Sequence, residues 1–201
     1  MKMWKKYLMS LVLFLRVYIL GGILSLSACT YHLGVGERTI PGGAKAVAIP
    51  VFRNKTMEPN IEMGFTNALI EEFKRSRVTE LTTKEEAEAI IEGEILEIRY
   101  VPGAKISAGD SSAPFLPQGT VLTTEYRINV IVEIRVVRKK DSAVLWSSRF
   151  TGERNYVAPQ VTLAGVNSVN PLYNLSARRQ NIDLMANDMM IEAHSRITES
   201  F

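Results

Sequence analysis

Cys29 is the only cysteine of this 201-residue chain, and its position suits one kind of chemistry. It directly follows Leu-Ser-Ala at the end of an apolar segment that opens with lysines. A basic start, an apolar stretch and small residues before a cleavage point are the order of a secretory signal. Cleavage before Cys29 would make it the first residue of the mature chain. The sequence therefore predicts a signal over residues 1–28.

This arrangement resembles a bacterial lipoprotein signal, which implies that the Cys29 thiol carries a thioether-linked lipid. Arg16 interrupts the apolar stretch, so either the basic region extends to Arg16 or translation begins at Met3 or Met9 instead of Met1, and neither choice moves Cys29. The alternative is an uncleaved transmembrane helix over residues 7–26, which is about long enough to span a bilayer. Arg16 near its centre would cost about 2.5 to 3.5 kcal/mol on insertion scales, which favours the cleaved signal.

The residue after Cys29 bears on the destination of the chain. Thr30 stands where an Asp would indicate retention in the inner membrane, so the lipoprotein resemblance implies an outer-membrane protein anchored by lipid on the periplasmic side. Several acyl chains on one cysteine make attachment effectively permanent, because each buried CH₂ contributes about 0.8 kcal/mol.

The chain offers little for catalysis. It has two histidines, His32 and His194, and its one cysteine is assigned to lipid, so no zinc-type ligand set can be assembled. Acidic residues at 71–72 and 85–88 are typical of solvated charge. We therefore expect no enzyme, no metal and no cofactor beyond the covalent lipid, and we expect His194 to lie at the surface or to cap its helix.

The charge balance argues against nucleic acid as a partner. The 24 Lys and Arg residues exceed the 21 Asp and Glu residues by three, and the sequence pI is about 9.0. Four of the basic residues and none of the acidic ones lie in residues 1–28. Removal of this segment leaves a nearly neutral chain, which lacks the basic excess that nucleic-acid binding requires.

The hydrophobic pattern predicts six main elements after a tether at residues 29–43, which is rich in glycine. A short apolar run predicts a strand, and apolar residues at three- and four-residue spacing then predict an amphipathic helix. Three alternating stretches predict strands, the first with a bulge near Leu96, and a long apolar stripe after Asn170-Pro171 predicts a closing helix of about seven turns. The ranges are 46–52, 59–76, 87–100, 120–137, 144–151 and 171–197.

This order, β-α-β-β-β-α, predicts an α+β fold with two helices packed on one face of a roughly four-stranded mixed sheet. Residues 44–201 would form this single domain. Residues 102–119 and 157–170 are predicted to be irregular. The second face of the sheet, which is mostly polar, would be left for solvent or a partner.

The segment over residues 47–73 reads Val-Ala-Ile-Pro-Val-Phe-Arg-Asn-Lys-Thr-Met-Glu-Pro-Asn-Ile-Glu-Met-Gly-Phe-Thr-Asn-Ala-Leu-Ile-Glu-Glu-Phe. It is similar to the opening strand and helix of the LptE family, the lipoproteins of lipopolysaccharide assembly. The resemblance extends over the mature chain. It includes Tyr31 soon after Cys29, the Ala89-Ile91-Gly93 strand, the long hairpin through Trp146 and the closing Ala-Arg-Arg helix.

The resemblance implies a non-enzymatic partner of the LptD β-barrel, which would plug the barrel lumen and help lipopolysaccharide reach the outer leaflet. Because lipopolysaccharide presents phosphates, Arg and Lys side chains at a strand end are natural donors to it. The predicted contacts are the four cations around the hairpin turn, Arg135, Arg138, Lys139 and Lys140. The segment over residues 47–54 also resembles other envelope lipoproteins, so a regulatory lipoprotein that binds a periplasmic enzyme such as a peptidoglycan synthase is the alternative.

Overall fold

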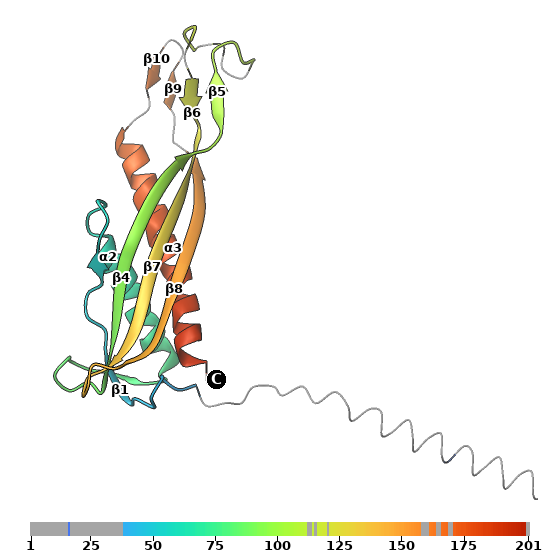
Figure 1. The fold of residues 1–201 in the computed structure, drawn as a ribbon. Coiled ribbons are helices and arrows are strands. Elements are labelled where there is room, and N and C mark those ends of the chain that lie inside the picture. The colour runs from blue at the N-terminus through green and yellow to red at the C-terminus, as the bar shows by residue number, and fades with distance from the viewer. Residues whose placement is uncertain are drawn as a thin grey trace, which may run out of the picture. The chain divides into compact units, whose positions relative to one another are not determined.

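The fold is built around three long strands that follow one another in an antiparallel meander (Figure 1). The computed structural model describes residue 16 and residues 38–199, except residues 112–113, 115, 120, 158–160, 164–165 and 169–170. Residues 38–201 form one unit of the chain by their contacts. The helices and strands are β1 (Ala46–Ala48), β2 (Arg53–Asn54), α2 (Ile61–Ser76), β3 (Glu80–Leu81), β4 (Ala89–Pro102), β5 (Lys105–Ser107), β6 (Val121–Thr123), β7 (Glu125–Arg138), β8 (Val144–Val157), β9 (Val161–Leu163), β10 (Val166–Ser168) and α3 (Pro171–Thr198).

The main sheet is mixed, as predicted. Its strand order is β3-β1-β4-β7-β8, with β2 also paired to β4. The short strands β1 and β2 run parallel to β4, whereas β4, β7 and β8 are antiparallel neighbours. The predicted strands correspond to β1, β4, β7 and β8, and the two-residue strands β2 and β3 complete the sheet.

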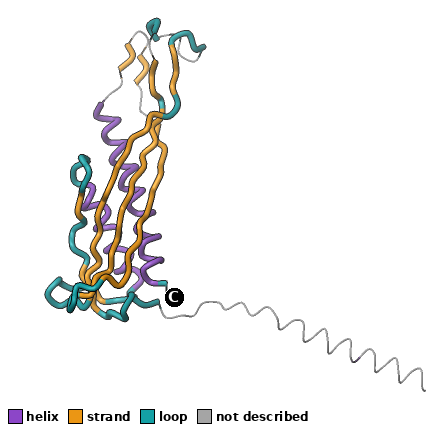
Figure 2. The backbone as a smooth tube through the Cα atoms, viewed as in Figure 1, coloured by secondary structure: helices purple, strands orange, loops and turns teal. Residues whose placement is uncertain are grey.

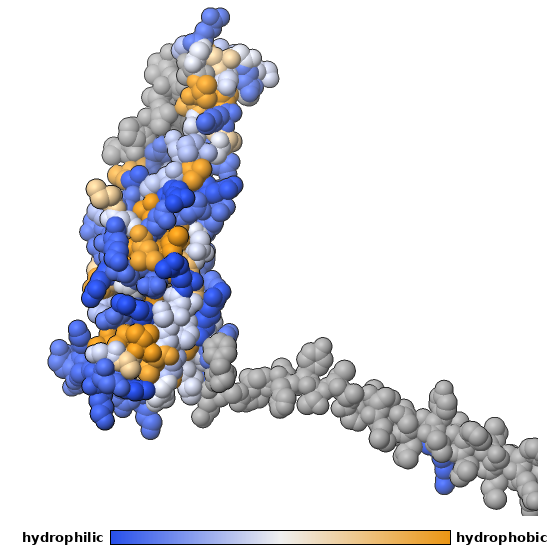
Figure 3. Space-filling view, in the orientation of Figure 1, coloured by the Kyte–Doolittle hydropathy of each residue, from blue (hydrophilic) through white to orange (hydrophobic). Residues whose placement is uncertain are grey.

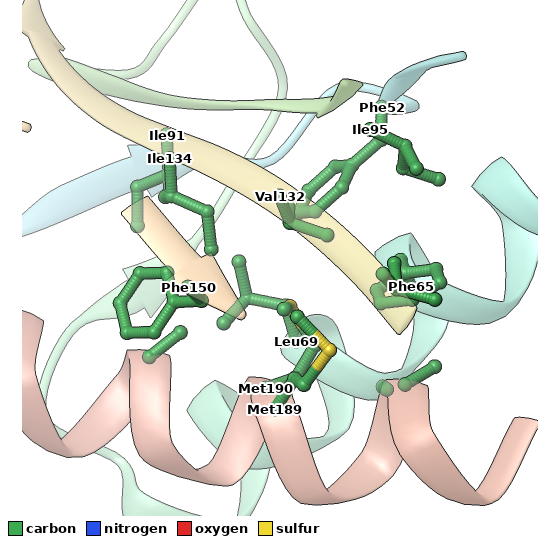
Figure 4. Packing of buried hydrophobic residues seen from close by; sticks show 14 of the residues in the cluster. Phe52, Phe65, Leu69, Ile91, Ile95, Val132, Ile134, Phe150, Met189 and Met190 are labelled. Carbon is green, nitrogen blue, oxygen red and sulfur yellow. The ribbon is translucent and has the colours of Figure 1, made fainter. Parts of the chain in front are cut away.

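Helices α2 and α3 both cover one face of this sheet, which confirms the predicted α+β layers (Figure 2). In α2, the buried side chains recur at helical spacing: Ile61, Phe65, Ala68, Leu69 and Phe73. In α3, the predicted stripe is buried from Ile182 to Ile197, whereas Leu175 is exposed. These stripes pack against the alternating residues of β4 and β7 to form one continuous core (Figure 4).

Two close approaches within this core require glycine. A Cβ at Gly93 in β4 would lie 2.3 Å from the ring of Phe52, and a Cβ at Gly152 in β8 would lie 2.5 Å from the Sδ atom of Met189. Gly93 thereby lets the Phe52 ring lie flat on the sheet, and Gly152 lets α3 approach β8 closely.

The predicted bulge in β4 is confirmed, because its register against β7 shifts between Ile95 and Glu97. Beyond it, Ile98 and Tyr100 turn towards the core. The strand expected over residues 46–52 was too long, since β1 ends at Ala48. Pro50 has no N–H to donate to a neighbouring strand, which explains the early end.

Short hairpins occur in or beside the two stretches predicted to be irregular. Residues 157–170 contain β9 and β10, whereas residues 102–119 contain β5, and its partner β6 lies in the first part of the strand predicted over residues 120–137. Strand β5 pairs with β6, and β9 pairs with β10, each over three residues and each antiparallel. Strand β8 also runs six residues further than predicted, to Val157. Three-residue strands carry no hydrophobic alternation that a sequence pattern can detect.

Candidate functional site

The turn between β7 and β8 carries three of the four cations predicted to bind a ligand. Asp141 shapes this turn, because its carboxylate accepts hydrogen bonds from the Ala143 N–H at 3.2 Å and from the Arg138 guanidinium at 2.9 Å. The Ala143 N–H and, secondarily, the Arg138 guanidinium hold the pKa of Asp141 below its usual value. The Arg138 N–H donates to the Ala143 carbonyl at 2.8 Å, and Ser142 takes a left-handed φ of 56°.

Contacts with the start of β4 hold the turn against the body. The Lys139 N–H donates to the Glu88 carbonyl at 3.0 Å, and the Lys139 ammonium donates to the Glu85 carbonyl. The Glu88 carboxylate in turn accepts from the Lys45 N–H at 2.8 Å. The turn is therefore positioned by residues 45 and 85–88, which are distant from it in the sequence.

A surface hollow with a volume of about 460 Å³ lies beside this turn. Apolar side chains line it, and charged side chains stand around them. Figure 3 shows apolar atoms gathered at this end of the sheet face in view. Such a lining suits a ligand with an anionic group and a short apolar part. The lining residues are Gly42, Ala44, Ala87, Glu88, Ala89, Arg138, Lys139, Lys140 and Leu145.

The cations of this hollow differ in how far they are already engaged. Arg138 is paired with Asp141, and Lys139 is bonded to a carbonyl. Lys140 is exposed and makes no hydrogen bond or ion pair with the described part of the chain. Its ammonium is therefore the one most available to a ligand.

The fourth predicted residue, Arg135, does not join this group. It pairs with Glu92 at 3.3 Å and lines a separate, smaller hollow together with Arg53 and Lys84. Residues three apart on a strand point to opposite faces and lie about 10 Å apart, which separates Arg135 from Arg138. The structure thus brings together three of the four residues, and ligand binding by all four stays a prediction.

A second polar group, which the sequence did not predict, joins α3 to the rest of the domain. Glu58, buried ahead of α2, accepts a hydrogen bond from the Tyr100 hydroxyl at 2.7 Å and pairs with Arg178 at 3.2 Å. The Arg178 guanidinium also lies over the Tyr100 ring, 5.1 Å from its centre. Burial and the neighbouring Glu58 raise the pKa of Tyr100 far above its usual value, so its hydroxyl stays protonated.

His194 is a correction to the sequence analysis, which expected it at the surface or as a cap of its helix. Only 3% of it is exposed, between α3 and the end of α2. Its Nε2 atom lies 2.7 Å from the Ser76 hydroxyl oxygen, and its ring stands edge-on to Phe73, 4.7 Å between centres. Burial lowers its pKa, so it is a neutral packing residue.

The open face of the sheet is polar, and ion pairs cross it from strand to strand. Arg127 of β7 pairs with Glu153 of β8 at 3.1 Å, and Arg149 of β8 pairs with Glu133 of β7 at 3.4 Å. Further pairs involve β4, which contributes Glu92 and Glu94. Charged side chains of both signs are therefore present on β4, β7 and β8. Figure 3 shows hydrophilic residues over much of this face, with hydrophobic residues between them.

The predicted signal, the predicted lipidation site at Cys29 and most of the tether lie outside the described residues. Within the described residues, no helix is both long and apolar enough to cross a bilayer. No cluster of three or more His, Cys, Asp or Glu side chains suited to a metal occurs in that same part of the chain.

Comparison with protein families gives a match over most of the described domain. The model of the LptE family, described as lipopolysaccharide-assembly, matches residues 44–199 and so covers both helices and the whole main sheet. No curated protein matches the chain.

Solved structures with a similar arrangement share little sequence. The PelC dodecamer of Paraburkholderia phytofirmans is 15% identical with a TM-score of 0.46, covering 77% of this chain and 89% of that one. A lipoprotein of Neisseria meningitidis is 9% identical with a TM-score of 0.39, covering 71% and 98%. Rare lipoprotein B of Shewanella oneidensis is 14% identical with a TM-score of 0.35, covering 76% and 89%. At these values the likenesses carry no functional argument.

Proposed function

The chain belongs to the LptE family of lipopolysaccharide-assembly lipoproteins, and from this premise we propose that it sits in the lumen of an LptD-type outer-membrane β-barrel as a plug. In this position it would help lipopolysaccharide reach the outer leaflet. It would do so without enzymatic chemistry.

The open face of the sheet is the observation that carries this proposal. The lumen of a large outer-membrane barrel is polar, and a body that fills it needs a polar surface with charges of both signs. Ion pairs such as Arg127 with Glu153 and Arg149 with Glu133 provide that surface along β7 and β8. A face of this kind can pair with polar lumen side chains without burying an unpartnered charge.

The anchor of the plug would be the lipid on Cys29, in the periplasmic leaflet of the outer membrane. Residues 30–37 would then connect the lipid to the described domain, which begins at Arg38. A fully extended segment of this length reaches about 30 Å. Since β1 and the β7–β8 turn lie at the same end of the sheet as Arg38, this end would be the one held near the membrane surface (Figure 1).

For the ligand, we propose that the hollow beside the β7–β8 turn receives a phosphate group of lipopolysaccharide. Arg138, Lys139 and Lys140 would donate to the phosphate oxygens, and Leu145 with the neighbouring alanines would contact an apolar part. Arg135, which lies in the second hollow, would contact a different part of the same large ligand.

Affinity capture tests the barrel assignment. The full chain, tagged at its C-terminus, is extracted from native outer membranes with mild detergent, and co-purified proteins are identified by mass spectrometry. We expect a large β-barrel of the LptD type in near-equal amount. A peptidoglycan synthase in its place would support the alternative function and overturn this one.

Charge removal tests the ligand assignment. We expect the variant R135Q/R138Q/K139Q/K140Q to lose at least about tenfold in lipopolysaccharide affinity, because each charged hydrogen bond to phosphate contributes about 1.5 to 3 kcal/mol. The variant K74Q/R75Q/K105Q/R179Q removes the same charge from exposed positions elsewhere and should bind normally. Comparison of R135Q alone with R138Q/K139Q/K140Q separates the two hollows, and unchanged binding in the fourfold variant would remove the assignment.

A further inference from the structure

The main sheet ends in two very different edges. On one side the last strand is β3, which has two residues, whereas on the other side it is β8, which has 14. Strand β8 pairs with β7 without a break from Trp146 to Val157, and no described strand lies along its outer edge (Figure 1). It contains no proline, and that stretch contains no bulge. An edge of this length and regularity is a template for pairing with another strand unless something covers it.

The sequence of β8 indicates what covers it, because this strand is self-complementary about Thr151. If a second β8 runs antiparallel with Thr151 opposite Thr151, each residue faces the one equally far on the other side of Thr151. On the open face of the sheet this sets Arg149 opposite Glu153 and Ser147 opposite Asn155. Opposite charges and two polar groups therefore meet, which are favourable cross-strand pairs.

The same register gives favourable pairs on the helix-covered face. Trp146 would face Tyr156, an aromatic pair, and Phe150 would face Gly152. Gly152 cannot carry a larger side chain, because α3 approaches it closely.

We propose that a second copy of this chain pairs with β8 across a two-fold axis at Thr151, which joins the two main sheets into one. Residues 146–156 of each strand then lie opposite their equivalents. Alternate pairs in an antiparallel ladder exchange two hydrogen bonds, so the joined edges would form about 10 to 12 backbone hydrogen bonds. The inference concerns free copies of the chain, since a single copy that plugs a barrel lumen could not pair in this way, and it is tested separately from the proposed barrel complex.

The charges already present on the sheet extend naturally into the second copy. Within one copy, Glu133 of β7 lies next to Arg149 of β8, and Glu153 of β8 lies next to Arg127 of β7. Pairing adds the contact between Arg149 and Glu153 of the other copy. The result is a row of alternating sign across the junction, and Arg149 and Glu153 each gain an opposite charge without losing the one they have.

Helix α3 supplies a second contact. The two-fold axis is perpendicular to the sheet, so both α3 helices lie on the same face, one beside the other. Asp188 is on the β8 side of α3, because it pairs with Arg154 of β8 at 3.3 Å. Leu184 and Ile191 lie one turn to either side of Asp188 and remain 40% and 43% exposed. The second α3 would cover these two apolar side chains.

Cysteine cross-linking of the full chain in mild detergent tests the register. In the variant T151C the two introduced cysteines lie opposite each other, at the Cα separation of about 4.5 to 5.5 Å that antiparallel pairs have and that a disulfide can bridge. We expect a covalent dimer on oxidation. The native Cys29 stays in every variant, so the wild-type chain sets the background.

Two further cysteine variants are the matched controls. Ser147 and Asn155 are exposed on the same strand and face as Thr151. In the dimer each lies about 27 Å from its own equivalent, so S147C alone and N155C alone should form no covalent dimer on oxidation. A mixture of S147C and N155C copies should cross-link, because these two positions are opposite. A dimer yield from T151C no higher than that from S147C would overturn the proposal, as would cross-linking of T151C to a different protein only.

A charge exchange tests the same pairing without cysteine. The variants R149E and E153R each place like charges opposite each other at two symmetric positions, and we expect about a tenfold or larger increase in the dimer dissociation constant. The double variant R149E/E153R restores opposite charges between copies, although within each copy it sets a carboxylate beside Glu133 and a guanidinium beside Arg127. Recovery of the dimer by the double variant is expected, and failure to recover with normal circular dichroism would contradict the two-fold register.

Discussion

At the scale of single residues, close packing and burial decide the roles that side chains play in this fold. His194 illustrates this, since a residue type associated with chemistry is used here to fill the contact between α3 and the end of α2. Gly93 illustrates the opposite case, in which the absence of a side chain makes room for the Phe52 ring.

Protonation of His194 should destabilise the domain. Burial lowers its pKa below the ordinary 6.5, and the nearby Arg38 and Arg75 act in the same direction while Glu72 opposes them. Above pH 6.5 both folded and unfolded chains hold the histidine neutral, so it contributes no pH dependence. As the pH falls below 6.5 the unfolded chain takes up the proton first, and the free energy of unfolding decreases until the folded pKa is reached.

The measurement is urea unfolding at about pH 7.5 and about pH 5.5 for the wild type and for H194Q, which brackets the ordinary histidine pKa. We expect a smaller loss of stability between the two pH values in H194Q than in the wild type. Equal losses would show that His194 does not titrate differently in the folded and unfolded chains.

Substitution of Gly93 should be costly. In G93A the new methyl group overlaps the Phe52 ring, and relief requires movement of a buried aromatic side chain. We expect a loss of about 1 to 3 kcal/mol in the free energy of unfolding, measured with urea. The control is G64A in α2, whose methyl group meets only the flexible Asp183 side chain, and which should be neutral or stabilising by up to about 1 kcal/mol.

At the scale of helices and strands, periodicity predicted the elements that bury a continuous face. Helices α2 and α3 and strand β4 were predicted to within two residues at each end, because each carries a stripe or an alternation. Strand β7 begins five residues later than predicted, and β8 ends six residues later. The bulge after Ile95 was visible for the same reason, since the alternation changes phase there. The hairpins β5–β6 and β9–β10 were missed, because three residues are too few to show a period.

The candidate site was predicted less well. Lys139 and Lys140 are adjacent to Arg138 in sequence and share its hollow, but Arg135 belongs to another one. The group of Glu58, Tyr100 and Arg178 joins positions 42 residues and more apart, and no local pattern marks such a contact. The charged residues are evident from the sequence, but strand register and helix placement decide which of their side chains meet.

The Glu58 group should hold the first half of α3 in place. R178M removes the guanidinium that pairs with the buried Glu58 and covers the Tyr100 ring. We expect it to lower the free energy of unfolding by about 1 to 3 kcal/mol, because a buried carboxylate loses its partner. Hydrogen exchange should increase first in α3 around residues 174–182.

The neighbouring variant R179M is the control for this prediction, since Arg179 is exposed and makes no hydrogen bond or ion pair with the described residues. It should leave both stability and exchange unchanged. A similar loss in R178M and R179M would mean that helix surface charge, and not the Glu58 group, accounts for the effect.

At the scale of the whole molecule, we expect the predicted anchor and the domain to have separate roles. The domain over residues 44–199 identifies the family, whereas membrane attachment is predicted from Cys29 alone. Because the two parts are independent, loss of the anchor should leave the fold intact and change only where the chain resides.

The variant C29A tests this separation. Intact-mass analysis of the wild type should show a chain that begins at Cys29 and carries lipid, and C29A should show neither cleavage before residue 29 nor lipid. Both chains should give the same circular dichroism spectrum of the folded domain after allowance for the leader. A wild-type chain of unmodified full-length mass would contradict the assignment.

The three central strands also have a length that matters. Strands β4, β7 and β8 each have 14 residues, which at about 3.3 Å per residue gives about 46 Å. A bilayer with its headgroups is about 40 to 45 Å thick. Held upright within a barrel, this ladder would reach from one water boundary of the membrane to the other. The charged β7–β8 turn and the pair of small hairpins would then face opposite sides of the membrane. The three strands would connect the side from which lipopolysaccharide arrives with the side to which it is delivered.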